Sequence, residues 1–86
     1  MRKVLYLLTK GPDRFSEALM VPPRSPEQDV SVVLMQDGVT LPKVPASKVY
    51  ALSEDVASRK IASPFQTISY RDVLRMIFEA DTVVAL

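Results

Sequence analysis

Residues 32–61 read VVLMQDGVTLPKVPASKVYALSEDVASRKI, and this stretch indicates the fold most directly. Two largely apolar runs, Val30–Met35 and Lys48–Leu52, are too short for helices, so each predicts a buried strand. Between them, Asp37-Gly38 resembles a hairpin turn. The residues that follow, up to Ser47, hold two prolines and no alternating pattern, which argues against a hairpin. We therefore expect parallel strands joined by an irregular crossover that holds at most one helical turn.

A helix is predicted directly after the second of these strands. Ser53 suits the N-cap position, and Glu54 and Asp55 lie in the first turn. Arg59 and Lys60 lie in the last turn, so the order of charges complements the helix dipole.

Apolar patterns elsewhere add three strands and two helices. The strands are predicted at Val4–Leu8, Gln66–Ser69 and Thr82–Leu86. One helix is predicted after Pro12, where Phe15, Ala18 and Leu19 fall at helical spacing. The other helix is predicted after the capping box Ser69–Asp72, and its apolar stripe consists of Val73, Leu74, Ile77 and Phe78. Residues 21–29 are expected to form a loop. Alternating strands and helices imply a parallel sheet with right-handed crossovers. We expect one α/β domain over residues 1–86, a three-layer flavodoxin-like fold of about five strands in the order 2-1-3-4-5.

Composition narrows the function classes. Eighty-six residues give a thin core, yet 48% are hydrophobic. We expect two causes: a sheet that is buried on both faces, and apolar surface that is covered by other chains. Eleven basic and ten acidic residues are interleaved, which argues against direct nucleic-acid binding. No apolar run is long enough to span a membrane, and the first residues lack the pattern of a signal peptide, so we expect a cytoplasmic protein.

The chain contains neither cysteine nor histidine. This excludes cysteine persulfide chemistry, Cys–His and Ser–His–Asp catalysis, and cysteine- or histidine-based zinc sites in this chain. We predict no catalytic residue, no metal and no cofactor.

Three segments are candidates for contact with a ligand or partner. Lys10 and Gly11 follow the first strand and could help to hold an anion, although a plain strand–helix turn explains them as well. Glu54 and Asp55, with Asp37 close in space, could act as acids or bind Mg²⁺, but carboxylates in a first turn usually complement the dipole. We therefore reject catalysis at these acids.

The third candidate segment is Gln36-Asp37-Gly38-Val39, at the carboxyl end of the second strand. That edge of an open α/β sheet is where ligands bind. The structural explanation is that Gly38 supplies a positive φ and that Asp37 accepts hydrogen bonds from nearby backbone N–H groups.

Residues 32–61, and QDGV above all, resemble the DsrH/TusB family, and the resemblance continues weakly through Ile68–Val73. The region after Val39 is shorter and richer in proline than in relatives. The resemblance implies a DsrEFH-like fold and a non-catalytic subunit of a sulfur-relay complex, which supports persulfide transfer by a cysteine-bearing DsrE/TusD-like partner together with a DsrF/TusC-like protein. It leaves open whether that transfer serves 2-thiolation of the tRNA wobble uridine or sulfur oxidation. The alternative is a stand-alone α/β module that self-associates and binds a small anion or regulatory ligand.

Overall fold

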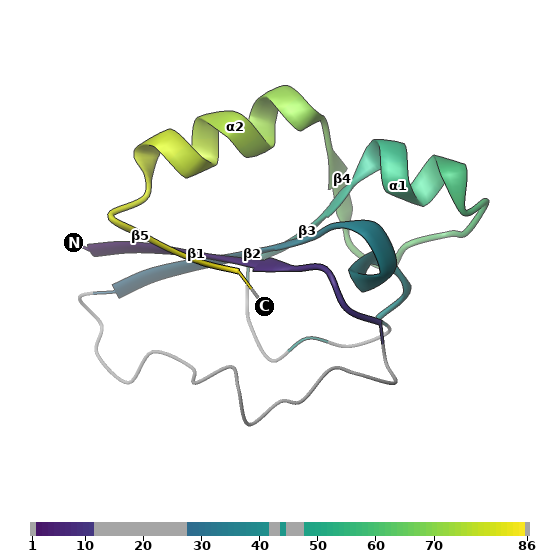
Figure 1. The fold of residues 1–86 in the computed structure, drawn as a ribbon, viewed down its shortest axis with the longest axis horizontal. Helices are drawn as coiled ribbons and strands as arrows, with labels where there is room; N and C mark the ends of the chain where they lie inside the picture. Colours follow the sequence, from purple (N-terminus) through teal and green to yellow (C-terminus); the bar gives the residue numbers. More distant parts are fainter. Residues whose placement is uncertain (1, 12–27, 42–43, 45–47, 86) are drawn as a thin grey trace.

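The computed structural model describes residues 2–11, 28–41, 44 and 48–85 of the chain. Within them, each strand from the third onward follows a helix, as expected for an α/β protein (Figure 1). In chain order, the elements are β1 (Arg2–Leu8), β2 (Gln28–Leu34), the 3₁₀ helix η2 (Gln36–Thr40), β3 (Val49–Leu52), α1 (Ser53–Ser58), β4 (Gln66–Ile68), α2 (Tyr70–Glu79) and β5 (Thr82–Ala85).

The five described strands form one parallel sheet in the order β4-β3-β2-β1-β5. β1 pairs with β2 on one side and with β5 on the other, so that Val4 lies opposite both Val30 and Thr82. The predicted parallel sheet of five strands is confirmed, whereas the predicted order 2-1-3-4-5 is wrong. The chain adds β2, β3 and β4 in succession on one side of β1, and it reverses direction only after β4.

The connections between the strands account for this order. Neighbouring strands lie about 4.8 Å apart, so the path from β4 to β5 spans four spacings, or roughly 19 Å. The ten residues of α2 make a helix of about 15 Å, which with its flanking residues bridges this span. Figure 1 shows α2 over the sheet between β4 and β5. The connection between β2 and β3 has only the five-residue η2 among its described residues, and it joins adjacent strands.

Side chains alternate between the two faces of the sheet and build a buried cluster on each. One cluster contains Leu8, Val32, Leu34, Val39, Leu41 and Ala51; the other contains Leu5, Val33, Leu52 and Val73. Val56 of α1 packs against the first cluster, and Met76 and Ile77 of α2 pack against the second. β2 lies in the middle of the sheet and is buried from both sides, which explains its apolar sequence.

Helix α2 begins with the predicted capping box. The backbone N–H of Asp72 donates to Ser69 Oγ at 3.2 Å, and the N–H of Ser69 donates to Asp72 Oδ2 at 3.3 Å. The predicted apolar stripe is only partly buried. Val73 is buried against the sheet, whereas Leu74 and Phe78 are exposed, because the side of α2 that faces the sheet also includes Met76 and Ala80.

Helix α1 differs from its prediction at both ends. Ser53 is not the N-cap: the strand β3 passes directly into the helix, Ser53 is its first residue, and Leu52 before it offers no side-chain cap. The helix ends at Ser58 and not at Lys60. The N–H groups of Lys60 and Ile61 donate to the carbonyls of Ala57 and Val56, and Lys60 has a φ of 52°, which together form a Schellman motif.

The strand predictions are correct in place, and the ends that the structure describes differ from them by at most two residues. The predicted last residue of the final strand, Leu86, lies outside the described residues. β2 begins at Gln28 and so includes two residues, Gln28 and Asp29, that were expected to lie in the preceding loop. The helix predicted after Pro12 lies outside the described residues.

Candidate functional site at the carboxyl edge of the sheet

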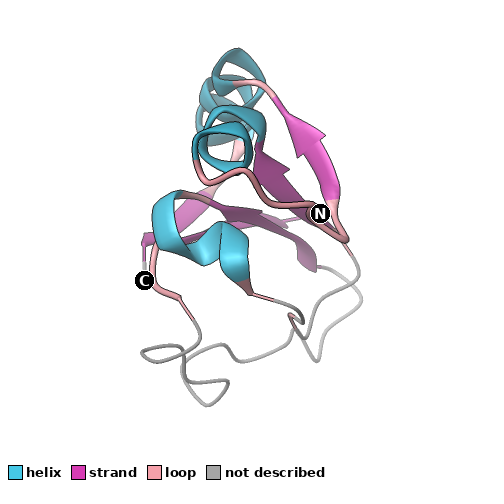
Figure 2. Ribbon diagram, turned by 90° about the vertical axis from the view of Figure 1, so that its right-hand side faces the viewer, coloured by secondary structure: helices cyan, strands magenta, loops and turns pink. Residues whose placement is uncertain are grey.

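Strands β1, β2 and β3 end side by side, and the segments that follow them meet at this edge. The eight residues singled out from the sequence all lie in these segments: Lys10 and Gly11 after β1, Gln36, Asp37, Gly38 and Val39 in η2, and Glu54 and Asp55 in α1. Figure 2 faces this edge, with η2 and α1 in the foreground. The backbone N–H of Met35 donates to the Leu8 carbonyl at 2.9 Å and joins the first two segments.

The backbone of η2 packs directly against the end of β1 at Gly38. A Cβ atom on Gly38 would fall onto the carbonyl oxygen of Leu8 and would lie 2.9 Å from the carbonyl carbon. The expectation that Gly38 supplies a positive φ is wrong: the positive φ, 50°, belongs to Gln36. Glycine is needed at position 38 because two backbones approach each other closely.

Arg59 joins η2 to α1 through two carboxylates. Its Nη2 donates to Asp37 Oδ1 at 3.0 Å, and its Nη1 lies 3.7 Å from Asp55 Oδ1. The other oxygen of Asp55 accepts a hydrogen bond from the backbone N–H of Gln36 at 2.7 Å. The expected closeness of Asp37 and Asp55 is therefore confirmed. Among the described residues, the Asp37 carboxylate pairs with Arg59, and no backbone N–H there is seen to donate to it.

This network holds the shape of the edge more than it stabilises the fold. The side chain of Asp37 is 74% exposed, and ion pairs of that kind contribute at most about 1 kcal/mol. The hydrogen bond from Gln36 to Asp55 has a more specific role. A left-handed backbone at a residue other than glycine costs about 1–3 kcal/mol, and Asp55 offsets part of this at Gln36.

The sequence indicated Arg59 only as a cation near a helix end. The signal that could have identified its pairing with Asp55 is their spacing of four residues on one helix. Nothing in the linear pattern signals the pairing with Asp37, which lies 22 residues away and depends on the order of β2 and β3 in the sheet.

The predicted residues differ in what they can offer to a ligand or partner. Four are exposed: Lys10, Gln36, Asp37 and Glu54. Gly38 and Val39 are buried, and the Val39 side chain belongs to the core, so these two shape the edge without facing outward. In the described part of the chain, no three cysteine, histidine, aspartate or glutamate side chains gather as a metal site would require. The edge can therefore bind through polar and charged groups, and it presents no sulfur or imidazole nucleophile.

A second polar group, which the sequence did not reveal, lies at the opposite end of the strands. Lys48 pairs with Asp29, and the hydrogen bond and negative charge of that carboxylate raise the pKa of Lys48. On the other side of Asp29, a half-open cleft of about 130 Å³ lies between β1, β2 and α2, and its lining includes Lys3, Ser31 and Glu79. The cleft depends on the register that places Lys3 opposite Asp29, which no sequence motif indicates.

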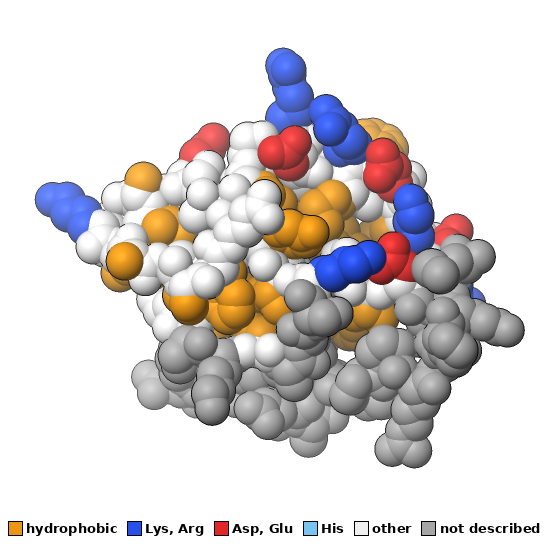
Figure 3. Space-filling model, turned by 180° about the vertical axis from the view of Figure 1, so that it is seen from behind, with side chains coloured by type: hydrophobic (Ala, Val, Ile, Leu, Met, Phe, Trp, Pro, Cys, Tyr) orange, Lys and Arg blue, Asp and Glu red, His pale blue; other side chains and the backbone are white. Residues whose placement is uncertain are grey.

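The chain matches no model of a known protein family, and no curated protein matches it. None of the described helices has the length and apolar character needed to cross a lipid bilayer. Figure 3 shows the face opposite to that of Figure 1, where basic and acidic side chains are interspersed around apolar ones. That distribution differs from the single-sign stripe typical of nucleic-acid-binding surfaces.

Proposed function

We propose that this protein is a non-catalytic, DsrH/TusB-like subunit of a sulfur-relay complex. One observation carries the proposal: the QDGV segment that resembles the family forms part of an ordered polar edge in a chain without any thiol. Persulfide transfer requires a cysteine thiolate, so the carrier must be another chain. The proposal makes a DsrE/TusD-like protein the carrier and a DsrF/TusC-like protein a further member of the complex.

The edge supports such a role through the contacts that join its segments. Arg59 and the Asp55 carboxylate hold η2 on α1 from two sides, and Gly38 allows η2 to lie directly on the end of β1. The Asp37 side chain is 74% exposed beside Arg59, so its carboxylate can accept further hydrogen bonds from a partner. Groups that are ordered before binding lose little conformational entropy when a partner arrives.

The proposal extends to the finer fold assignment and to the cellular location. A five-stranded parallel sheet with helices supports a DsrEFH-like, three-layer fold. A persulfide carrier needs reduced thiols, so we place the complex in the cytoplasm. The partner's reaction is either 2-thiolation of the tRNA wobble uridine or sulfur oxidation. In either case the role of this chain is to bind the partner proteins.

The test is reconstitution with defined partners. The chain is co-expressed with the DsrE-like and DsrF-like proteins of the same genome, and complex formation is measured by gel filtration with light scattering. We expect a stable complex that weakens at least about tenfold with Asp37→Ala, because a charged hydrogen bond at an interface is worth 1.5–3 kcal/mol. Glu79→Ala on α2 is the matched control and should bind these partners normally.

Two outcomes contradict the proposal. A chain that forms homo-oligomers and ignores both partners favours the stand-alone ligand-binding module. A complex that forms equally well with Asp37→Ala, in a folded variant, removes the carboxyl edge from the interface.

A further inference from the structure

The cleft between β1, β2 and α2 is lined by charged side chains from three elements. Lys3 lies on the same face of the sheet as Leu5, two residues later, which belongs to the buried cluster beneath α2. Asp29 lies opposite Lys3 in the register of β1 and β2, so it shares that face. Glu79 comes from the last turn of α2. The starts of two strands and the end of one helix therefore place three charges around one opening.

Backbone contacts fasten the end of α2 to the start of β1. The N–H of Asp81 donates to the carbonyl of Lys3 at 2.8 Å, and the N–H of Lys3 donates to Asp81 Oδ2 at 2.8 Å. Val73 and Met76 pack α2 against the same face of the sheet. These contacts form the cleft in the free protein, so a ligand need not order its walls on binding.

Two of the three charges lack a counterpart. Asp29 pairs with Lys48. Among the residues that the structure describes, neither Lys3 nor Glu79 belongs to an ion pair, and the two lie more than 4.0 Å from each other although they line the same cleft. A ligand that carries one negative and one positive group can approach both, whereas a singly charged ligand is attracted by only one of them.

The size and the remaining lining restrict that ligand further. The cleft of about 130 Å³ is slightly smaller than a cavity of about 150 Å³ that holds benzene, so the enclosed part of a ligand has about six non-hydrogen atoms. Leu5 and Met76 provide apolar contact, and Ser31 provides a hydroxyl group. We propose that the cleft binds a small zwitterionic amino acid, with its carboxylate at Lys3 and its ammonium group at Glu79.

Titration of the full chain with L-alanine tests the proposal. Lys3 and Glu79 are exposed and the cleft is half-open, so water screens both contacts and we expect a dissociation constant on the order of 1–10 mM. Proton–nitrogen correlation spectra are recorded near neutral pH and at constant ionic strength, up to about 50 mM ligand. The amide signals of Lys3, Ser31 and Ala80 should shift and saturate. Shifts that are absent or do not saturate overturn the proposal.

Two analogues test the need for both charges. N-acetyl-L-alanine keeps the carboxylate and lacks the ammonium group, and L-alaninamide keeps the ammonium group and lacks the carboxylate. Each should bind at least about fivefold more weakly than L-alanine, because each loses one charged hydrogen bond. An analogue that binds as tightly as L-alanine shows that one charge is sufficient and overturns the zwitterion assignment.

Two variants test the residues assigned to the ligand. Lys3→Met and Glu79→Gln each remove a charge at similar side-chain length, and each should weaken L-alanine binding at least about fivefold. Both positions are exposed, so the variants should fold normally. Glu54→Gln on α1 is the matched control, because it removes an equally exposed carboxylate outside the cleft and should leave the affinity unchanged. Wild-type affinity in either cleft variant overturns the proposal.

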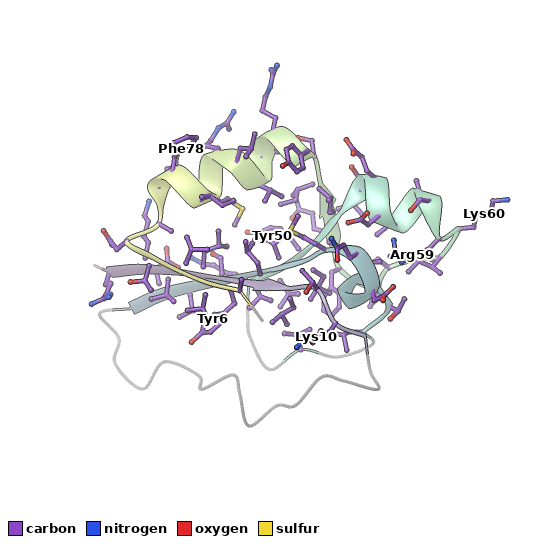
Figure 4. All side chains as sticks on the ribbon, in the orientation of Figure 1. Tyr6, Lys10, Tyr50, Arg59, Lys60 and Phe78 are labelled. Atoms are coloured by element: carbon purple, nitrogen blue, oxygen red, sulfur yellow. The ribbon has the colours of Figure 1, made fainter. Side chains whose placement is uncertain are left out.

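This proposal and the sulfur-relay proposal can fail separately. The cleft lies at the starts of β1 and β2, away from the carboxyl edge, which Lys10 and Arg59 mark in Figure 4. Glu79→Gln should lose L-alanine and still bind the DsrE-like and DsrF-like proteins, whereas Asp37→Ala should show the reverse. If L-alanine shifts the amides of Gln36 and Glu54 in place of those around the cleft, the ligand binds at the carboxyl edge and the cleft assignment is rejected.

Discussion

Replacing Gly38 by alanine tests the close approach between η2 and the end of β1. The added methyl group would overlap the carbonyl oxygen of Leu8, so one of the two backbones must move. Overpacking of this kind costs about 1–3 kcal/mol. That carbonyl also accepts the N–H of Met35, and a weakened bond adds about 0.5–1.5 kcal/mol. We expect the free energy of unfolding to fall by about 2–4 kcal/mol, a large part of the roughly 4–13 kcal/mol typical of a chain this size.

Urea unfolding followed by far-ultraviolet circular dichroism measures this change. The midpoint for Gly38→Ala should fall by about 1 M or more. Gly11→Ala is the matched control, because its Cβ would meet the Thr40 hydroxyl at 3.3 Å and the Asp37 carbonyl oxygen at 3.4 Å, contacts that small shifts relieve. That variant should stay within about 1 kcal/mol of the wild type. Equal midpoints for the two alanine variants would refute the role given to Gly38.

Three further changes test other parts of the fold. Ser69→Ala removes the cap of α2 and should lower the free energy of unfolding by about 1 kcal/mol in the same urea assay. Ser69→Asp also provides a capping oxygen and should retain most of the wild-type stability. Asp81→Ala loses the hydrogen bond that Lys3 N–H donates to Asp81 Oδ2 at 2.8 Å, and amide exchange in β5 should become about three- to tenfold faster; unchanged exchange contradicts this anchor. Because Asp29 raises the pKa of Lys48, the pair stabilises the fold fully below about pH 10.4, and this stabilisation is lost as pH rises through the raised pKa. The urea midpoint of Lys48→Gln should therefore fall less between pH 9 and 12 than that of the wild type.

The elements of this fold were predictable where the signal is local. The strands appear as short apolar runs because both faces of the sheet are buried, and the α2 start appears as Ser69 and Asp72 at capping-box spacing. The strand order was not predictable in the same way. Each strand–connection–strand unit looks alike in sequence, and only the direction of each crossover decides between 2-1-3-4-5 and 4-3-2-1-5.

In the candidate site too, the position of the segments could be predicted from the sequence, whereas the contacts between them could not. The carboxyl ends of parallel strands share one edge, so the meeting of the segments around Lys10, Asp37 and Asp55 could be anticipated from the sequence. The internal contacts of the site could not. Gly38 resembles a turn glycine, and its dependence on the Leu8 carbonyl appears only when β1 and β2 are in register.

The pairing of β1 with β5 has a consequence for folding kinetics. Lys3 and Asp81 bond across 78 positions of the chain, so one side of β1 remains open until the last strand is in place. Closing so long a loop is slow, and sheets built from such distant pairs fold in roughly milliseconds to seconds. During that interval the apolar strand β1 presents an unpaired edge to which other unfolded chains can add. Refolding yield should therefore decrease as protein concentration rises, even though β5 covers Val4–Leu7 on this edge of β1 in the folded sheet.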